Sequence, residues 1–199
     1  MNNNSTKLQI KDLVTIGIFT AIYVFINLIT ELISGIAPIV WILKPVNLSI
    51  LCGVVFLPLM AKVQKSGAVL IMGLIPSLLY LVRGGFAFLL VITMVIFCLI
   101  GELVRKKTGF NSFKGNAVAY AFFSAGQIGD FIPLWFMQDQ MKVTMLEKGM
   151  PQDYVAGIEA VTPLWLLFVV FAATFILSFL GAFLAKIIMK KHLEKAGMI

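Results

Sequence analysis

Successive long apolar runs are the feature that most constrains what this chain can fold into. Of its 199 residues, 60% are hydrophobic and only 13% are charged, whereas soluble globular domains are about one quarter charged. A soluble core of this composition would leave too few polar residues to cover its surface. Because a membrane-spanning helix needs about 20 apolar residues, the chain has room for about six spans. The sequence therefore predicts an all-α integral membrane protein, a six-transmembrane-helix bundle without a large soluble catalytic domain.

Polar, basic or Gly/Pro-containing segments separate the apolar runs. The short third run contains Pro76 and is expected to be kinked or tilted. The sixth run begins at Pro163, and proline fits the first turn of a helix. Residues 138–160 are mixed polar and amphipathic and form the one long connection. We expect a single membrane domain over residues 1–199, with spans at about 13–33, 39–61, 68–82, 86–104, 116–137 and 163–188.

Basic residues are divided unequally between the connecting segments. Positively charged connections favour the cytoplasmic side of a membrane. If both termini are cytoplasmic, that side holds Lys7, Lys11, Lys62, Lys65, Arg105, Lys106, Lys107, Lys114, Lys186, Lys190, Lys191 and Lys195, and the other side holds Lys44, Arg83, Lys142 and Lys148. The imbalance predicts a multi-pass protein of the cell membrane with both termini in the cytoplasm, which requires an even number of spans.

The net charge of +7 does not indicate a nucleic-acid partner, because the basic residues lie between apolar runs rather than on one face. Cys52 and Cys98 each lie inside an apolar run, without a partner at metal-ligand spacing. The single histidine, His192, is in the basic tail. We therefore expect no metal site, no disulfide framework and no cofactor.

Ionisable groups inside a membrane span are costly unless they are paired or hydrated, so each one suggests a function. A helix rises about 1.5 Å per residue, so Glu31 lies about 28 Å, Lys44 about 27 Å, Asp130 about 24 Å and Gln127 about 20 Å from the cytoplasmic ends of their spans. Charged and amide groups at one level, with aromatic side chains beside them, are typical of a ligand pocket. The predicted outward-facing binding site comprises Asp130, Gln127, Glu31, Lys44, Asn47, Arg83, Trp135, Trp41 and Trp165.

Structural roles explain some of these residues equally well. The tryptophans can form an interfacial belt, and Lys44 and Arg83 can extend to the lipid headgroups. Glu31 and Lys44 can also pair with each other as a structural contact. Gln127 and Asp130 favour the pocket more strongly, since residues three apart lie on one face of a helix.

Small residues indicate where helices pack closely. Ala117, Ala121, Ala125 and Gly129 are spaced four apart on the fifth run, where packing within the protein is the simpler explanation. Gly17 and Ala21 are four apart on the first run, and a partner helix explains them as well as internal packing does.

Several catalytic signatures are missing from the sequence. There is no G-x-x-x-x-G-K-[ST] phosphate loop, so the chain is not expected to hydrolyse ATP by itself. There is no H-E-x-x-H motif, and Asp130 is the single deep aspartate, which argues against intramembrane metalloproteases and aspartyl proteases. We therefore do not expect an enzyme.

Five stretches resemble one known family of membrane proteins, the Trep-Strep family, and together they extend over nearly the whole chain. These stretches are KLQIKDLVTIGIFTAIYVF, AKVQKSGAVLIMG, SFKGNAVAYAFFSAGQIGDFIPLWFM, GMPQDYVAGIEAVTP and KKHLEKAGMI. We identify the family with the substrate-specific (S) components of energy-coupling factor (ECF) transporters.

The resemblance implies a six-helix bundle that captures a vitamin-like solute or a metal ion from outside. Its implied partners are a membrane-embedded T component and two ABC-type ATPases, which agrees with the missing phosphate loop. Many S components contact the T component through an Ala-x-x-x-Ala pattern, and the matching positions here are Gly17 and Ala21. A metal ion is not expected, because the chain lacks the His-rich N-terminus of nickel and cobalt S components. Two other functions stay open: a stand-alone facilitator or channel, and a small enzyme that acts on lipid with Asp130 and Glu31 as acid and base.

Overall fold

The fold is described from a computed structural model of the chain, which covers residues 7–195; the side chains of Arg83 and of residues 191–195 lie outside this description. Every regular element in the described part is helical. The elements are α1 (Ile10–Ser34), α2 (Pro38–Ile42), α3 (Lys44–Leu51), α4 (Gly53–Lys62), α5 (Ala68–Tyr80), η1 (Leu81–Arg83), α6 (Ala87–Thr108), α7 (Phe113–Ala125), η2 (Gly126–Asp130), α8 (Pro133–Phe136), α9 (Gln138–Glu147), α10 (Gln152–Ala160) and α11 (Leu164–Lys195).

The long helices are apolar enough to cross a membrane. Among the described residues, α1, α6 and Leu164–Lys190 of α11 each have the required length and hydropathy, and the bent pair α3–α4 qualifies if it is one span. The apolar α5 is shorter, with 13 residues. Large apolar side chains such as Leu32 and Val82 are more than three-quarters exposed, as expected of a surface in contact with lipid. The molecule is therefore an all-helical integral membrane protein; the count of six spans and the side of the termini stay predictions.

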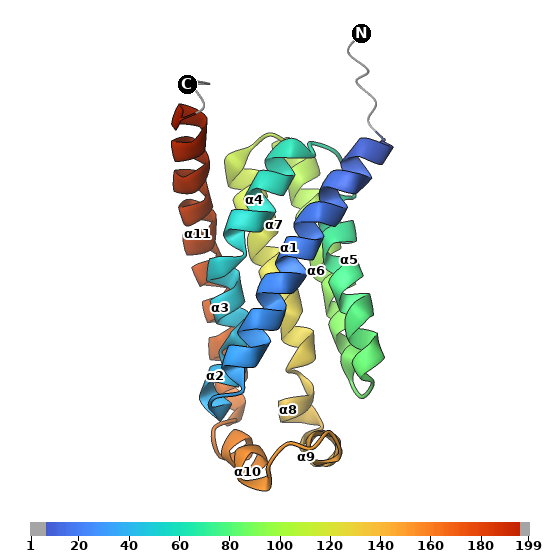
Figure 1. Cartoon of the computed structure of the whole chain (residues 1–199), viewed down its shortest axis with the longest axis vertical. Coiled ribbons are helices and arrows are strands. Elements are labelled where there is room, and N and C mark those ends of the chain that lie inside the picture. Colours follow the sequence, from blue (N-terminus) through green and yellow to red (C-terminus); the bar gives the residue numbers. More distant parts are fainter. Residues whose placement is uncertain (1–6, 196–199) are drawn as a thin grey trace.

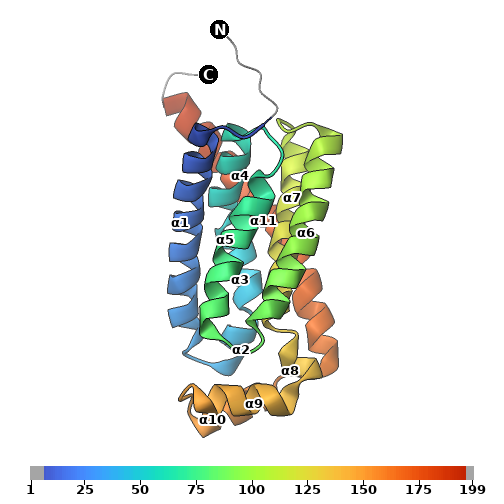
Figure 2. The ribbon, with the colours of Figure 1, turned by 90° about the vertical axis from the view of Figure 1, so that its right-hand side faces the viewer.

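The helices are arranged along one long axis. α1, α3–α4, α5, α6, α7 and α11 run along this axis, whereas α9 and α10 lie across one end (Figures 1 and 2). The start of α1 and the end of α11 are both at the opposite end (Figure 1). The segment 138–160, expected to be a long connection, thus forms two helices that cap the bundle.

The second apolar run is not one continuous helix. It contains three short helices, and α3 and α4 are bent by 46° relative to each other where they meet at Cys52. Pro45 occupies the first turn of α3, where its missing N–H costs little. Both α3 and α4 approach α11 closely at two glycines: a Cβ atom on Gly53 of α4 would lie 2.4 Å from the backbone of Gly181, and one on Gly181 would lie 2.4 Å from Ser49 O of α3.

The small residues of the fifth run pack inside the protein. Ala117, Ala121 and Ala125 are buried, and a Cβ atom on Gly129 would lie 2.7 Å from Leu89 O of α6. The regular helix ends at Ala125 and continues as the tighter 3₁₀ helix η2. This close approach of α7 and η2 to α6 confirms internal packing for the stripe.

Arg105 links three segments of the chain at the end of the bundle that carries the termini. Its guanidinium is fully buried, donates to Asn116 Oδ1 at 2.8 Å and to Val63 O at 2.9 Å, and lies 3.8 Å from a Glu102 carboxylate oxygen. Arginine has several donors in a fixed plane, which lets one side chain join α6, α7 and the connection after α4.

Candidate functional site

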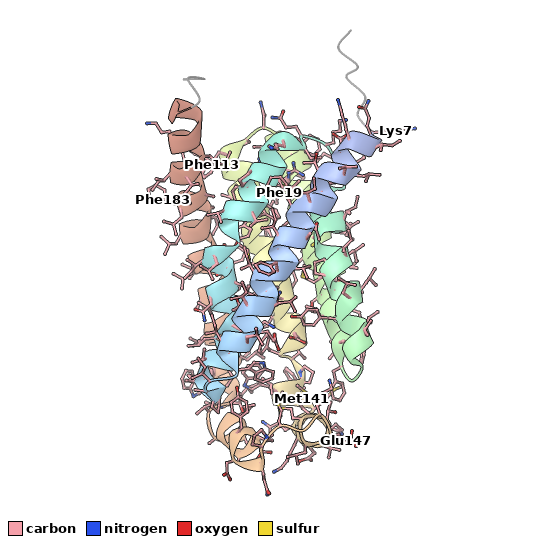
Figure 3. All side chains as sticks on the ribbon, in the orientation of Figure 1. Lys7, Phe19, Phe113, Met141, Glu147 and Phe183 are labelled. Carbon is pink, nitrogen blue, oxygen red and sulfur yellow. The ribbon has the colours of Figure 1, made fainter. Side chains whose placement is uncertain are left out.

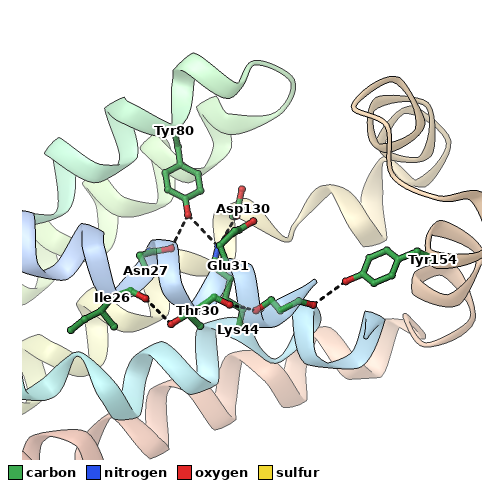
Figure 4. Close-up of polar contacts among 9 residues, drawn as sticks. Ile26, Asn27, Thr30, Glu31, Lys44, Tyr80, Asp130 and Tyr154 are labelled. Atoms are coloured by element: carbon green, nitrogen blue, oxygen red, sulfur yellow. Dashed lines mark hydrogen bonds and ion pairs between the residues drawn. The ribbon is translucent and has the colours of Figure 1, made fainter. Parts of the chain in front are cut away.

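Lys44 is at the centre of a polar cluster near the capped end of the bundle. Its side chain is 3% exposed, forms an ion pair with Glu31 and lies with Nζ 4.0 Å from Asp130 Oδ2. Nζ also donates a hydrogen bond to Tyr80 Oη at 3.2 Å. These contacts join α1, α3, α5 and η2 around one ammonium group (Figure 4).

The local fold explains why Lys44 needs these carboxylates. Lys44 is the first residue of α3, where the helix dipole places partial positive charge. An ammonium group at this position is unfavourable by itself, and burial away from water adds a desolvation cost. The carboxylates of Glu31 and Asp130 offset both contributions, so the two acids share one buried cation.

A second hydrogen bond extends the cluster toward the inside of the bundle. Tyr80 donates its hydroxyl proton to Asn27 Oδ1 at 2.8 Å while its oxygen accepts from Lys44. Hydrogen bonds in series polarise and strengthen one another in a low dielectric. Asn27 is buried, so this chain of contacts fixes α1 against α5 at the level of the lysine.

Two cavities flank the cluster and share the lining residues Tyr80 and Asp130. The inner cavity measures about 20 Å³, which is room for about one water molecule. The outer cavity measures about 440 Å³ and lies beneath the cap, which is large enough for a small molecule. The inner cavity is lined by Tyr23, Asn27, Lys44, Gly73, Pro76, Ser77, Tyr80, Leu90, Met94, Gln127, Asp130 and Phe131, and the outer by Glu31, Trp41, Tyr80, Gly84, Phe86, Ala87, Asp130, Met141, Thr144, Met145, Lys148 and Met150.

Aromatic packing closes the inner cavity on the side away from the cap. Tyr23 lines that cavity and packs against Phe123 with ring centroids 5.4 Å apart. Phe56 lies 5.0 Å from the ring centroids of both Phe123 and Tyr120, and all four side chains are at most 2% exposed. In the described part of the chain, the polar cavity thus ends in a packed core rather than in a continuous pore.

Tyr154 connects the cap to the rim of the site. Its hydroxyl donates to Ser34 O at 3.0 Å and links α10 to the last turn of α1 (Figure 4). Burial, and then the nearby Glu31 carboxylate, raises the pKa of Tyr154 above its ordinary value. The phenol therefore keeps the proton that it donates. A Cβ atom on Gly157 would lie 2.9 Å from Pro38, so α10 also packs closely on α2.

The structure brings together most of the residues expected at the site. Glu31, Lys44, Gln127 and Asp130 line the cavities, and the pairing of Glu31 with Lys44, expected as one structural alternative, is present as well. Trp41 lines the outer cavity and packs on Phe131 at a ring-centroid distance of 5.3 Å.

Trp135 does not line either cavity. The indole of Trp135 is buried in the apolar cluster that contains Trp41, and its N–H donates to Pro163 O at 3.0 Å, which ties α8 to the start of α11. The side chain of Arg83 lies outside the described residues.

Asn47 and Trp165 lie on the outer surface instead of in the cavity. Asn47 is exposed on the face of α3 that also carries Leu43 and Leu51, at a helical spacing of four. Trp165 is 62% exposed beside the exposed Phe168, as expected of an interfacial aromatic residue. Their height along the axis agreed with the site, but height does not determine which face of a helix a residue occupies.

Sequence reasoning missed several residues of the outer cavity. Tyr80 was not singled out, although it follows Pro76 by four residues on one helical face, at the polar end of the short third run. The methionines Met141 and Met145 are also four apart, in a segment recognised as amphipathic. Methionine adapts to irregular apolar contacts, so this spacing was the available signal for a surface that lines a cavity.

The comparisons with known proteins give one match. A model of the family described as "Hypothetical bacterial integral membrane protein (Trep_Strep)" matches residues 10–195. No curated protein and no solved structure matches the chain. The match extends from the first residue of α1 to the last residue of α11, so all helices that build the cavity lie within it. The chain therefore belongs to the Trep_Strep family of bacterial integral membrane proteins.

Proposed function

We propose that this protein is the solute-binding S component of an ECF-type importer. The observation that carries the proposal is the capped outer cavity of about 440 Å³, which lies beside the Lys44 cluster at the end of the bundle opposite the termini. With the predicted orientation, this cavity faces the outside. A site of this form binds and encloses a small solute.

The lining supports a small water-soluble ligand with a flat ring and polar substituents. Trp41, Phe86 and Tyr80 provide aromatic surface, and Glu31, Asp130 and Lys148 provide charges of both signs. A heteroaromatic vitamin or its precursor combines an apolar ring face with groups that pair with such charges. This is the substrate class that we propose.

The outer face of α1 supports a partner helix. Gly17 and Ala21 are exposed, and a Cβ atom on Gly17 would meet no atom within 4 Å. Exposed small residues let a second helix approach closely within a membrane. In our proposal this face binds the T component, and two ATPase subunits supply the nucleotide hydrolysis for which the chain lacks a motif.

Transport in this proposal does not need a pore through the bundle. The packed aromatic residues beneath the inner cavity support carriage of the enclosed solute by movement of the whole protein, which topples in the membrane when it docks on the T component. ATP hydrolysis by the partner subunits then resets it. The same packing argues against a stand-alone facilitator or channel. An enzyme that acts on lipid would differ in another way, because the isolated protein would convert its lipid substrate without partner subunits.

Native mass spectrometry of the purified protein tests the proposal. We expect a small co-purifying molecule that is retained by the wild-type protein and lost when Asp130→Asn or Lys44→Gln alters the cluster. Co-expression with a T component and two ECF ATPases should yield a complex that drives ATP-dependent uptake of that molecule. Uptake of the same molecule by the isolated protein in vesicles, without ATPases, would instead identify a facilitator.

A further inference from the structure

A groove separate from the two cavities of the Lys44 cluster lies between α7 and α11, at the end of the bundle that carries the termini. It measures about 410 Å³ and is lined by Phe113, Lys114, Ala117, Val118, Phe179, Ala182 and Phe183. All of these residues except Lys114 are apolar. Figure 3 places Phe113 and Phe183 at the same end of the molecule as Lys7, far from Met141 of the cap.

The groove follows from the sizes of the side chains on the two helices. Ala117 and Ala182 are buried where α7 and α11 pack together, and their short side chains leave space between the larger residues around them. Phe179 and Phe183 are 38% and 56% exposed, so aromatic walls stand on the lipid-facing side. In a membrane protein, an open apolar groove of this kind is filled by hydrocarbon rather than by water.

Two ammonium groups mark one end of the groove. Lys114 lines it directly, and Lys186 Nζ lies 5.1 Å from the ring centroid of Phe113. Among the described residues, no carboxylate lies within ion-pair distance of either lysine: Asp12 pairs with Lys65 at 2.6 Å, and Glu102 lies beside Arg105. The two ammonium groups at this end of the groove are therefore available to an anionic ligand.

We propose that this groove binds one anionic phospholipid, with its phosphate between Lys114 and Lys186 and one acyl chain against the phenylalanines. Phe179 and Lys186 are seven residues apart, so the apolar wall extends to about 10 Å along α11 from the cation. That order, cation at the helix end and hydrocarbon surface deeper, matches the order of headgroup and chain in a bilayer. Basic pockets between membrane helices recognise anionic headgroups in this way. The proposal does not depend on the solute or on the ECF assignment.

Native mass spectrometry of the full-length protein, titrated with phosphatidylglycerol or phosphatidylcholine, tests this site. We expect wild-type protein to bind one phosphatidylglycerol more tightly than phosphatidylcholine. The double variant Lys114→Gln/Lys186→Gln should weaken phosphatidylglycerol binding by about tenfold or more. Val118→Trp, which fills the groove and keeps both lysines, should weaken the binding of both lipids. Glycerol phosphate alone should not displace the bound lipid, because it lacks the acyl chain.

The matched control is Lys106→Gln/Lys107→Gln, which removes the same charge from exposed positions at the end of α6. Its phosphatidylglycerol affinity should stay within about twofold of wild type. Equal losses in the two double variants would overturn the proposal, since they would reflect general attraction of a basic surface. Unchanged lipid binding in Val118→Trp, combined with loss of a co-purifying membrane protein, would also overturn it and assign the groove to a protein partner.

Discussion

Lys44 Nζ lies 4.0 Å from Asp130 Oδ2, which joins the start of α3 to the 3₁₀ turn that follows α7. Between these two residues the chain passes through α3–α4, α5, α6 and α7, and it reverses direction between successive segments. The contact therefore joins parts of the bundle that are far apart in the sequence. The same lysine pairs with Glu31 of α1, so the site and the helix packing depend on one another.

Replacing Asp130 by asparagine is expected to weaken solute binding. The carboxylate borders both cavities, and loss of a charged hydrogen-bond partner in a buried site typically costs about 1–3 kcal/mol, so the Kd should rise by about tenfold to a hundredfold. Isothermal titration with the identified solute measures this change. Gln127→Ala should also weaken binding.

Thr174→Ala is the control for these two variants. Thr174 is buried in α11, and its hydroxyl donates to Val170 O of the same helix, away from both cavities. Affinities within about twofold of wild type for both Asp130→Asn and Gln127→Ala would show that η2 does not form the binding site.

The Lys44 cluster also makes a prediction about stability. Lys44→Met removes the one ammonium group that Glu31 and Asp130 share, so it should lower the free energy of unfolding by about 1–3 kcal/mol. The loss should not be larger, because each carboxylate side chain is 27% exposed and solvent weakens the repulsion. Glu31→Gln should cost less, since Lys44 keeps Asp130 and Tyr80. Thermal unfolding in detergent ranks the variants, and a larger loss in Glu31→Gln than in Lys44→Met would contradict the shared-cation arrangement.

Tyr154 is expected to control how readily the cap opens. Tyr154→Phe removes the hydrogen bond to Ser34 O, which is worth about 1 kcal/mol, and should increase the dissociation rate of the solute by about fivefold. Stopped-flow exchange experiments measure that rate. Lys142→Gln provides the comparison within the cap. The side chains of Lys142 and Glu159 are 43% and 40% exposed, so their ion pair contributes little to the stability of the cap. If both variants release the solute at the same rate, the Tyr154 contact does not hold the cap closed.

Bulky side chains on the outer face of α1 are expected to prevent assembly. Gly17→Trp or Ala21→Trp should abolish co-purification with the T component, because neither leaves room for close helix approach, while solute binding by the isolated protein is retained. Ile96→Trp on α6 is the matched control, since Ile96 is 51% exposed on another helix. Assembly and uptake that survive both α1 variants would assign the docking surface elsewhere.

The predicted orientation is tested by labelling single cysteines in intact cells. A cysteine at Lys148 should react with a membrane-impermeant thiol reagent, and a cysteine at Lys107 should not. The native Cys52 and Cys98 are buried and should not interfere. Equal labelling at the two positions would contradict the model with six spans and cytoplasmic termini.

The sequence predicted the helical membrane fold and the level of the site because both depend on composition and on helical rise. Glu31, Lys44 and Asp130 were placed at one height by counting residues, and they do meet. Rise alone says nothing of rotation, so Asn47 was assigned to the cavity although the path of α3 turns it outward with Leu43. Pro38 and Pro45 stand at the starts of α2 and α3 and were available as local signals for the division of the second run, whereas the 46° bend between α3 and α4 has no proline at Cys52 to report it.

The contact between Gly53 and Gly181 restricts how this family member can change over time. Each Cα atom faces the other helix's backbone at a distance that admits a hydrogen but not a methyl group. A substitution at either glycine therefore cannot be absorbed by a neighbouring rotamer; it requires α11 to move as a unit away from α3 and α4. Because α3 packs on α11 through this contact and begins at Lys44, mutational drift at a site without any polar group would alter the geometry of the charged cluster at the opposite end of α3.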